Sequence, residues 1–122
     1  MNRVELRGNL VAKPELKFTP DGKAWASFSI GVNRYSKNSE GEWNSELDGF
    51  FYCVAFGHVA QKVEHWDKGD DVILIGKLRQ SKKEGDDGVT QYRISILVKE
   101  IYRLKKSSVN SPENEESEEL PF

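Results

Sequence analysis

Hydrophobic and polar residues alternate through most of the first 104 positions, a pattern typical of β-strands with one buried face. In residues 4–10 every second position is apolar or glycine, and residues 15–18 resume the alternation after Pro14. A turn that contains proline and glycine at residues 19–22 precedes a second alternating segment at residues 24–32. The first third of the chain therefore predicts two strands, the first of them interrupted at Pro14.

The middle of the chain combines a continuous apolar run with a helical spacing. Residues 50–56 are apolar on both faces, which predicts a third strand that is covered on both sides. Val59, Val63 and Trp66 follow at positions i, i+4 and i+7, one stripe of a short helix, and Gly69 is typical of a helix end. We therefore expect one short helix after the third strand.

Two further strands and two polar segments complete the pattern. The alternation at residues 72–80 predicts a fourth strand, and the alternation at residues 92–104 predicts a fifth. Residues 34–47 and 81–88 are polar and contain glycine, so they predict loops. The first of these loops is long for a hairpin, which suggests a functional role.

Five strands with one short helix between the third and the fourth are typical of the OB-fold, a partly open Greek-key barrel that binds oligonucleotides on one sheet face. The sequence therefore predicts an all-β domain, a five-stranded OB-fold barrel, over residues 1–104. Residues 105–122 lack a buried-face pattern and are rich in Ser, Asn, Pro and Glu, so we expect a disordered linker and an acidic tail there.

The formal net charge of −2 for the 122 residues conceals an uneven distribution. Residues 107–122 contain five acidic residues and no Lys or Arg, whereas residues 1–106 contain 18 Lys and Arg against 15 Asp and Glu, a net charge of +3. A mildly basic body with an acidic tail hints at a nucleic-acid binder, although a charge of +3 alone is common.

Several function classes are disfavoured by what the sequence lacks. No apolar run approaches the roughly 20 residues that span a bilayer, and no signal segment opens the chain, so we expect no membrane partner. The single Cys53 suits a reducing compartment, so we expect a cytoplasmic protein. His58, His65 and one cysteine fall short of a zinc site, and no phosphate loop or nucleophile elbow occurs. We therefore expect no enzyme activity, no metal and no cofactor.

Ordered stretches of this chain resemble bacterial single-stranded DNA-binding proteins. The resemblance covers residues 2–104 in order and the last six residues separately, and these stretches carry it: Asn2 to Leu10, Lys13-Pro14-Glu15, Thr19 to Lys23, Ala26 to Arg34, Phe50 to Gly57, Ala60 to Val63, Lys68 to Asp70 and Gly76 to Arg79. It implies an OB-fold, a homotetramer and non-catalytic binding of unpaired DNA in replication, recombination and repair. The family often has an aromatic residue between the fourth and fifth strands, where this chain has Lys82-Lys83.

Binding unpaired nucleic acid without sequence preference requires cations along a groove and aromatic rings on which bases stack. The candidate cations lie mostly on predicted outward strand faces: Arg3, Arg7, Arg34, Lys77, Arg79, Lys82, Lys83 and Arg93. Any one of them is equally well explained as a solvated surface charge.

The candidate stacking residues are aromatic side chains outside the expected core: Trp25, Tyr35, Trp43, Phe50 and Phe56. Phe50 and Phe56 match family stacking positions and share a strand face with Tyr52 and Val54, a face that could instead be core. An outward Trp25 requires a ligand or a partner subunit. Phe28 and Trp66 are expected in the core.

The end of the chain has the composition of a docking peptide. The family tail typically ends in acidic residues followed by an apolar residue, Pro and Phe, and this chain ends in Glu118, Glu119, Leu120, Pro121 and Phe122. Apolar residues at the end of a polar tail suit capture in an apolar pocket rimmed by basic residues. We expect these five residues to bind replication and repair proteins, and the acids could also compete with DNA.

Two other functions remain open on the sequence alone. The body could be a protein-interaction module in which Trp25 and residues 50–56 contact subunits or partners. It could also bind RNA, as cold-shock-like OB domains do. Catalysis would need residues that we do not find.

Overall fold

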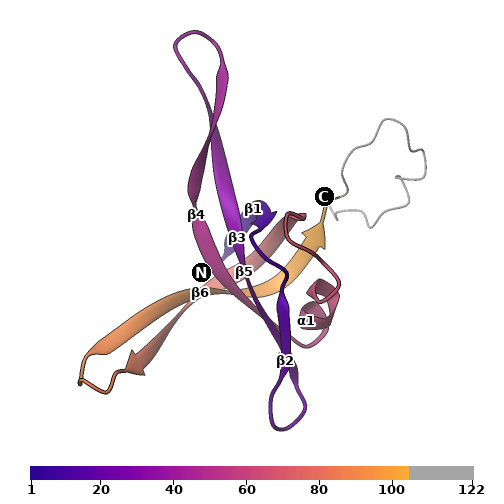
Figure 1. The fold of residues 1–122 in the computed structure, drawn as a ribbon, viewed down its shortest axis with the longest axis vertical. Helices are drawn as coiled ribbons and strands as arrows, with labels where there is room; N and C mark the ends of the chain where they lie inside the picture. The colour runs from indigo at the N-terminus through magenta and orange to yellow at the C-terminus, as the bar shows by residue number, and fades with distance from the viewer. Residues whose placement is uncertain (105–122) are drawn as a thin grey trace.

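The computed structural model describes residues 1–104, so the predicted tail and its five docking residues lie outside the described residues. Six strands and one helix follow one another along the chain (Figure 1): β1 (Val4–Leu10), β2 (Glu15–Phe18), β3 (Ala24–Lys37), β4 (Trp43–Phe56), α1 (Gly57–Val63), β5 (Asp71–Glu84) and β6 (Thr90–Arg103). The domain is all-β with one short helix between β4 and β5, as the sequence predicts.

Five of the strands close into a barrel. The strands follow one another in the order β1-β5-β6-β4-β3, and two residues of β1, Asn9 and Leu10, pair with Gly31 and Ile30 of β3 to close the ring. The pairing of β4 with β6 is parallel, and the other pairings are antiparallel. Strand β2 lies outside this ring and pairs only with β3. The interrupted first strand of the sequence pattern is therefore two strands: β1 belongs to the ring and pairs with β5 and β3, and β2 lies outside the ring and pairs with β3 alone.

The inward faces of the barrel strands form the core. Side chains at every second position are buried there, among them Ala26, Phe28 and Ile30 of β3 and Cys53 and Ala55 of β4. Helix α1 covers one end of the barrel with Ala60 and Val63. The expected core positions of Phe28 and Trp66 are confirmed, although α1 ends before Trp66, which is buried from the segment after the helix.

Two predictions about local structure were wrong. Residues 34–47, expected as a loop, are mostly strand, and so is the first half of residues 81–88, because β3 with β4 and β5 with β6 continue as two-stranded arms beyond the barrel (Figure 1). The turn of the first arm is held by Asn38, whose Oδ1 accepts hydrogen bonds from the Glu40 and Glu42 backbone nitrogens at 2.9 and 2.8 Å. Polar cross-strand pairs on a solvated arm do not show the alternation that predicts a strand.

The expectation that residues 50–56 are covered on both faces is also wrong for the single chain. Cys53 and Ala55 point into the core, whereas Phe50 is 64% exposed and Phe56 is 46% exposed. The two aromatic side chains therefore lie on the outer surface of the barrel. An apolar run predicts burial on both faces only where a second layer is present to cover the outer one.

Closure of the barrel requires two glycines at which neighbouring strands approach closely. A Cβ atom on Gly8 would lie 2.4 Å from the Gly31 carbonyl oxygen, and one on Gly76 would lie 2.3 Å from the Leu97 carbonyl oxygen. Any side chain at these positions must push the strands apart.

We therefore expect Gly76→Ala to lower the free energy of unfolding by about 3 kcal/mol, because the added methyl group overlaps backbone that cannot move without opening the barrel. Urea unfolding at one protein concentration measures the loss. Gly57→Ala is the control, since Gly57 has open space around it and only a positive φ of +62°, which costs a non-glycine residue about 1 kcal/mol. Equal losses for the two variants would contradict the role of close approach.

Burial gives Cys53 a testable pH dependence. Burial raises the pKa of its thiol to about 12, so the unfolded chain, with an ordinary thiol pKa near 8.5, loses this proton first as the pH rises. The Cys53 contribution to stability is therefore complete below about pH 8.5 and is lost progressively as the pH approaches 12. In urea titrations between pH 8 and 11, Cys53→Ala should lose less stability with rising pH than the unaltered chain, and identical pH profiles would refute the prediction.

Candidate nucleic-acid interface

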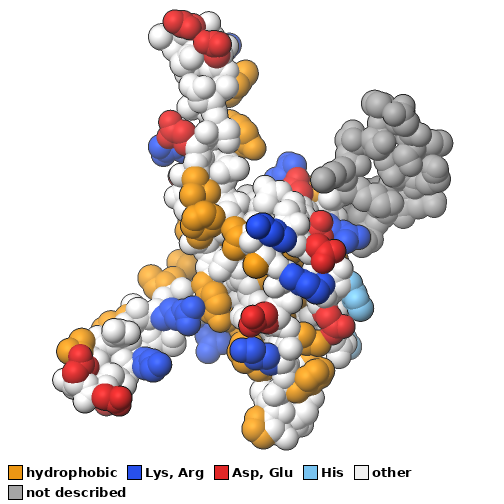
Figure 2. Space-filling model, viewed as in Figure 1, with side chains coloured by type: hydrophobic (Ala, Val, Ile, Leu, Met, Phe, Trp, Pro, Cys, Tyr) orange, Lys and Arg blue, Asp and Glu red, His pale blue; other side chains and the backbone are white. Residues whose placement is uncertain are grey.

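A groove of about 260 Å³ runs across the outer face of β4, β6 and β5. It is lined by aromatic, aliphatic, hydroxyl and guanidinium groups: Tyr52, Val54, Phe56, Arg79, Ser81, Arg93, Ser95 and Leu97. Three of these residues, Phe56, Arg79 and Arg93, are sequence-predicted site residues. The groove lies where the β5–β6 arm leaves the barrel, and Figure 2 shows hydrophobic and basic side chains together at the base of that arm.

Strand register brings these side chains to one face. Successive residues of a strand point to opposite faces, so the residues between buried core positions point outward. On the β5–β6 arm, Arg79 lies opposite Ser95 and Ser81 lies opposite Arg93. The parallel pairing of Val54 with Leu97 then joins this face to the outer face of β4.

One contact inside the groove joins a cation to a ring. The Arg93 guanidinium carbon lies 4.0 Å from the centre of the Tyr52 ring, which is cation–π geometry. Tyr52 was not among the predicted site residues, although the period of two already placed it on the face of Phe50 and Phe56. The alternation of residues 50–56 could therefore have identified Tyr52 as a site residue.

Two more predicted aromatic residues extend the groove along β3 and β4. Trp25 lies opposite Phe56 in the β3–β4 register, with the Lys17 Nζ 5.4 Å from the centre of its ring. Phe50 lies opposite Gly31, and its ring atoms are 3.3 and 3.4 Å from the place where a Gly31 Cβ would be. The outer face of β3 and β4 therefore carries a row of aromatic groups from Trp25 to Phe50.

The predicted cations fall into two classes by their ion pairs. Five of them make no ion pair with any of residues 1–104, and all lie on β5 or β6: Lys77, Arg79, Lys82, Lys83 and Arg93. Lys83 shares the strand face of Arg79, whereas Lys82 lies on the other face, opposite Tyr92. The cations without ion pairs thus concentrate on the arm that borders the groove.

The remaining three predicted cations face carboxylates. Arg7 donates to both carboxylate oxygens of Asp71 at 2.8 and 3.3 Å, and Arg34 donates to Glu46 at 2.7 Å and lies 3.8 Å from Asp48. These hydrogen bonds raise the pKa of each guanidinium further. Arg3 lies 3.3 Å from Glu5. A guanidinium that is already neutralised by a carboxylate attracts a phosphate less strongly.

Tyr35 and Trp43 lie on the β3–β4 arm, away from the groove. Tyr35 lines a second pocket with Arg7. Trp43 is exposed near the end of the arm, where the Lys37 Nζ lies 5.9 Å from the centre of its ring. The structure therefore gathers Phe56, Arg79 and Arg93 in one groove, places Trp25, Phe50, Lys77 and Lys83 along its borders, and leaves the other candidates elsewhere.

Aromatic faces beside free cations can hold a polyanion with exposed rings. Within residues 1–104, no group of three His, Cys, Asp or Glu side chains is arranged to hold a metal ion. No helix among the same residues has the length and apolar character needed to cross a membrane.

Comparison with known proteins agrees with this geometry. The family model for the single-strand binding protein family matches residues 1–104. The chain belongs to the single-strand binding protein family. It is 39% identical over 110 residues to a single-stranded DNA-binding protein of Fusobacterium nucleatum, a match that covers 88% of this chain and 71% of that protein. It is 36% identical over 106 residues to single-stranded DNA-binding protein 3 of Listeria innocua, covering 86% of this chain and 64% of the relative.

Solved structures place this family member in the predicted fold. The Plasmodium falciparum SSB complex with ssDNA has a TM-score of 0.73 at 20% identity and covers 86% of this chain and 96% of that one. A single-stranded DNA-binding protein from Thermus aquaticus, a deletion mutant, has a TM-score of 0.72 at 20% identity, with coverage of 87% and 51%. At this identity the likeness concerns the fold, and it confirms the predicted OB-fold.

Proposed function

We propose that this protein binds single-stranded DNA without strong sequence preference and protects it during replication, recombination and repair. The observation that carries the proposal is the groove in which Arg79 and Arg93, free of ion pairs within residues 1–104, lie beside Tyr52 and Phe56. The cations can attract the phosphates of a bound strand. The aromatic rings can stack on its bases whatever their identity, because every base has a face that can stack. The chain belongs to the single-strand binding protein family, and its relatives are named single-stranded DNA-binding proteins, which supports the same function. The role is non-catalytic and uses no cofactor.

We further propose that the chain works as a homotetramer. Two surfaces of the single chain support self-association. Residues 4–8 of β1 pair with β5 on one edge, while the other edge has no strand partner among the described residues. The β5–β6 arm also carries an exposed apolar face with Leu78, Tyr92 and Ile94. Open strand edges and apolar patches of this kind mark association surfaces.

The tail supplies the second half of the proposed function. Its acidic residues and the terminal Leu120, Pro121 and Phe122 suit docking into replication and repair proteins in the cytoplasm, at the nucleoid. The support is the composition of the chain end, since these residues lie outside the described part. Recruitment and protection would then be divided between the tail and the barrel.

The first test is a titration of oligo-dT into the full chain, followed by tryptophan fluorescence at low and at high salt. We expect saturable quenching that weakens with salt, because Trp25 borders the groove whereas Trp66 is only 4% exposed. Trp25→Phe should remove most of the quenching and keep the affinity within about threefold, since a ring remains for stacking. Trp43→Phe is the matched control.

A gel-shift assay accompanies the titration, together with an RNA of equal length. Failure of DNA to quench and to shift would reject DNA binding and favour a protein-interaction module, for which the exposed apolar face of the β5–β6 arm would be the contact. Tighter binding of RNA than of DNA would instead assign the groove to RNA.

The free cations of the groove have a distinct salt signature. The logarithm of the binding constant falls linearly with the logarithm of the salt concentration. Replacing one phosphate-binding cation makes this slope shallower by about 0.7 on single strands, because one fewer phosphate is neutralised and fewer counterions are released. We expect this change for Arg79→Ala. Lys68→Ala is the charge-matched control, because Lys68 is exposed, makes no ion pair within residues 1–104, lies before β5 and does not line the groove. Equal slopes for the two variants would argue against groove binding.

A further inference from the structure

The β5–β6 arm has few attachments where it leaves the barrel (Figure 1). The pairing of β1 with β5 ends at Gly76, and β4 pairs with β6 at Ile96 and Leu97 only. Among the described residues, positions 79–84 of β5 and 90–95 of β6 therefore pair only with each other. No side-chain hydrogen bond or ion pair within residues 1–104 joins this part of the arm to another element.

The side chain of Asn2 makes the last attachment on the β5 side of the arm. Its Nδ2 donates a hydrogen bond to the Leu78 carbonyl oxygen at 2.8 Å, and the Leu78 backbone nitrogen donates to the Asn2 Oδ1 at 2.9 Å. Antiparallel pairing continued beyond Val4 and Gly76 would bring residue 2 opposite Leu78. The Asn2 amide therefore supplies, from a side chain, the donor and the acceptor that a strand backbone would supply at this point.

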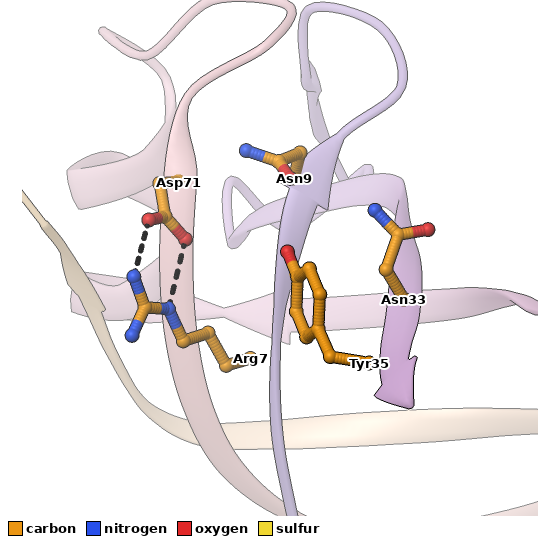
Figure 3. A pocket seen from close by; sticks show the side chains of 6 residues that line it. Arg7, Asn9, Asn33, Tyr35 and Asp71 are labelled. Carbon is orange, nitrogen blue, oxygen red and sulfur yellow. Dashed lines mark hydrogen bonds and ion pairs between the residues drawn. The ribbon is translucent and has the colours of Figure 1, made fainter. Parts of the chain in front are cut away.

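The residue that follows Leu78 is a cation of the groove. Arg79 lines the groove and makes no ion pair within residues 1–104. A carboxylate fixes the guanidinium of Arg7, which Figure 3 shows bound to both oxygens of Asp71. Arg79 has no such carboxylate, so the direction of its side chain depends on the position of the strand backbone. Because neighbouring residues of a strand point to opposite faces, a twist of β5 at Leu78 would turn Arg79 out of the groove.

The other strand of the arm is attached by a different contact. Arg93 of β6 lies 4.0 Å from the centre of the Tyr52 ring of β4. This cation–π contact holds β6 against the barrel and leaves β5 to the two hydrogen bonds of Asn2. The two groove arginines therefore depend on different barrel residues, Arg93 on Tyr52 and Arg79 on Asn2.

We propose that Asn2 is a positioning residue for DNA binding, whose amide holds β5 at Leu78 and so keeps Arg79 in the groove before a strand arrives. The inference rests on the proposed function. A site that is already ordered binds more tightly, because less conformational freedom is lost on binding. Asn2 is uncharged and does not line the groove, so its removal takes away no phosphate contact.

The test is Asn2→Ala in the full chain, with oligo-dT titrations followed by fluorescence at several salt concentrations. We expect the affinity to fall roughly two- to tenfold, the cost of ordering one long side chain on binding. The salt slope should stay that of the unaltered chain, because the same number of phosphates is neutralised. Hydrogen exchange at the Leu78 amide should become faster, since the Asn2 Oδ1 no longer accepts its hydrogen bond.

Asn9→Ala is the matched control for this variant. Asn9 is also exposed, and its Nδ2 donates a hydrogen bond to a backbone carbonyl, that of Gly69 at 3.2 Å. It lies at the other end of β1 and does not line the groove. We expect Asn9→Ala to keep the affinity and the Leu78 exchange rate of the unaltered chain.

A double variant separates positioning from a general loss of stability. In the Arg79→Ala background, Asn2→Ala should cost clearly less affinity than in the unaltered chain, because the side chain that it positions is gone. Equal losses in the two backgrounds, a shallower salt slope for Asn2→Ala, or a changed molar mass in sedimentation would overturn the positioning role. Unchanged affinity of Asn2→Ala would overturn it too, while DNA binding by the unaltered chain would stand. If the unaltered chain binds no oligo-dT, the proposed function fails and this role fails with it.

Discussion

The barrel depends on two close approaches of backbone to backbone. Gly8 lies where a Cβ would be 2.4 Å from the Gly31 carbonyl oxygen, and Gly76 lies where a Cβ would be 2.3 Å from that of Leu97. Because neighbouring strands lie this close, β1 reaches β3 and the ring closes, which divides every strand into an inward and an outward face. The inward face is filled by the core. The outward face is thereby left to aromatic and basic side chains, whose positions follow from the same alternation.

Strand length decides where the functional side chains lie. Four strands of 14 residues are longer than the barrel requires, and their ends continue as the two arms. Each arm keeps the register of its barrel strands, so Arg79 and Arg93 on one arm share an outer face with Tyr52 on the barrel. A loop of the same composition would not hold these groups in fixed order. The groove is therefore a consequence of regular pairing carried past the core.

The sequence was sufficient for the fold class and for the core, because buried alternation is strong where one face is covered. Phe28 and Trp66 are buried as expected. It failed for the arms, since residues 34–47 and 81–88 are mostly polar and lack a regular alternation, and their pairing depends on a partner strand. It also could not rank the candidate cations. Arg34 looked as available as Arg93, and only the cross-strand register, which puts Glu46 opposite Arg34 and Ser81 opposite Arg93, separates them.

That separation gives the outer surface two chemistries. Near Tyr52, cations without ion pairs can attract phosphates through Coulomb forces that salt weakens, and this attraction is indifferent to base identity. Beside β1, Asp71 neutralises Arg7, so this region offers an exposed ring and uncharged amides in place of a free cation. The β3–β4 register, in which Phe50 lies against Gly31, keeps these two regions on one outer face of the barrel.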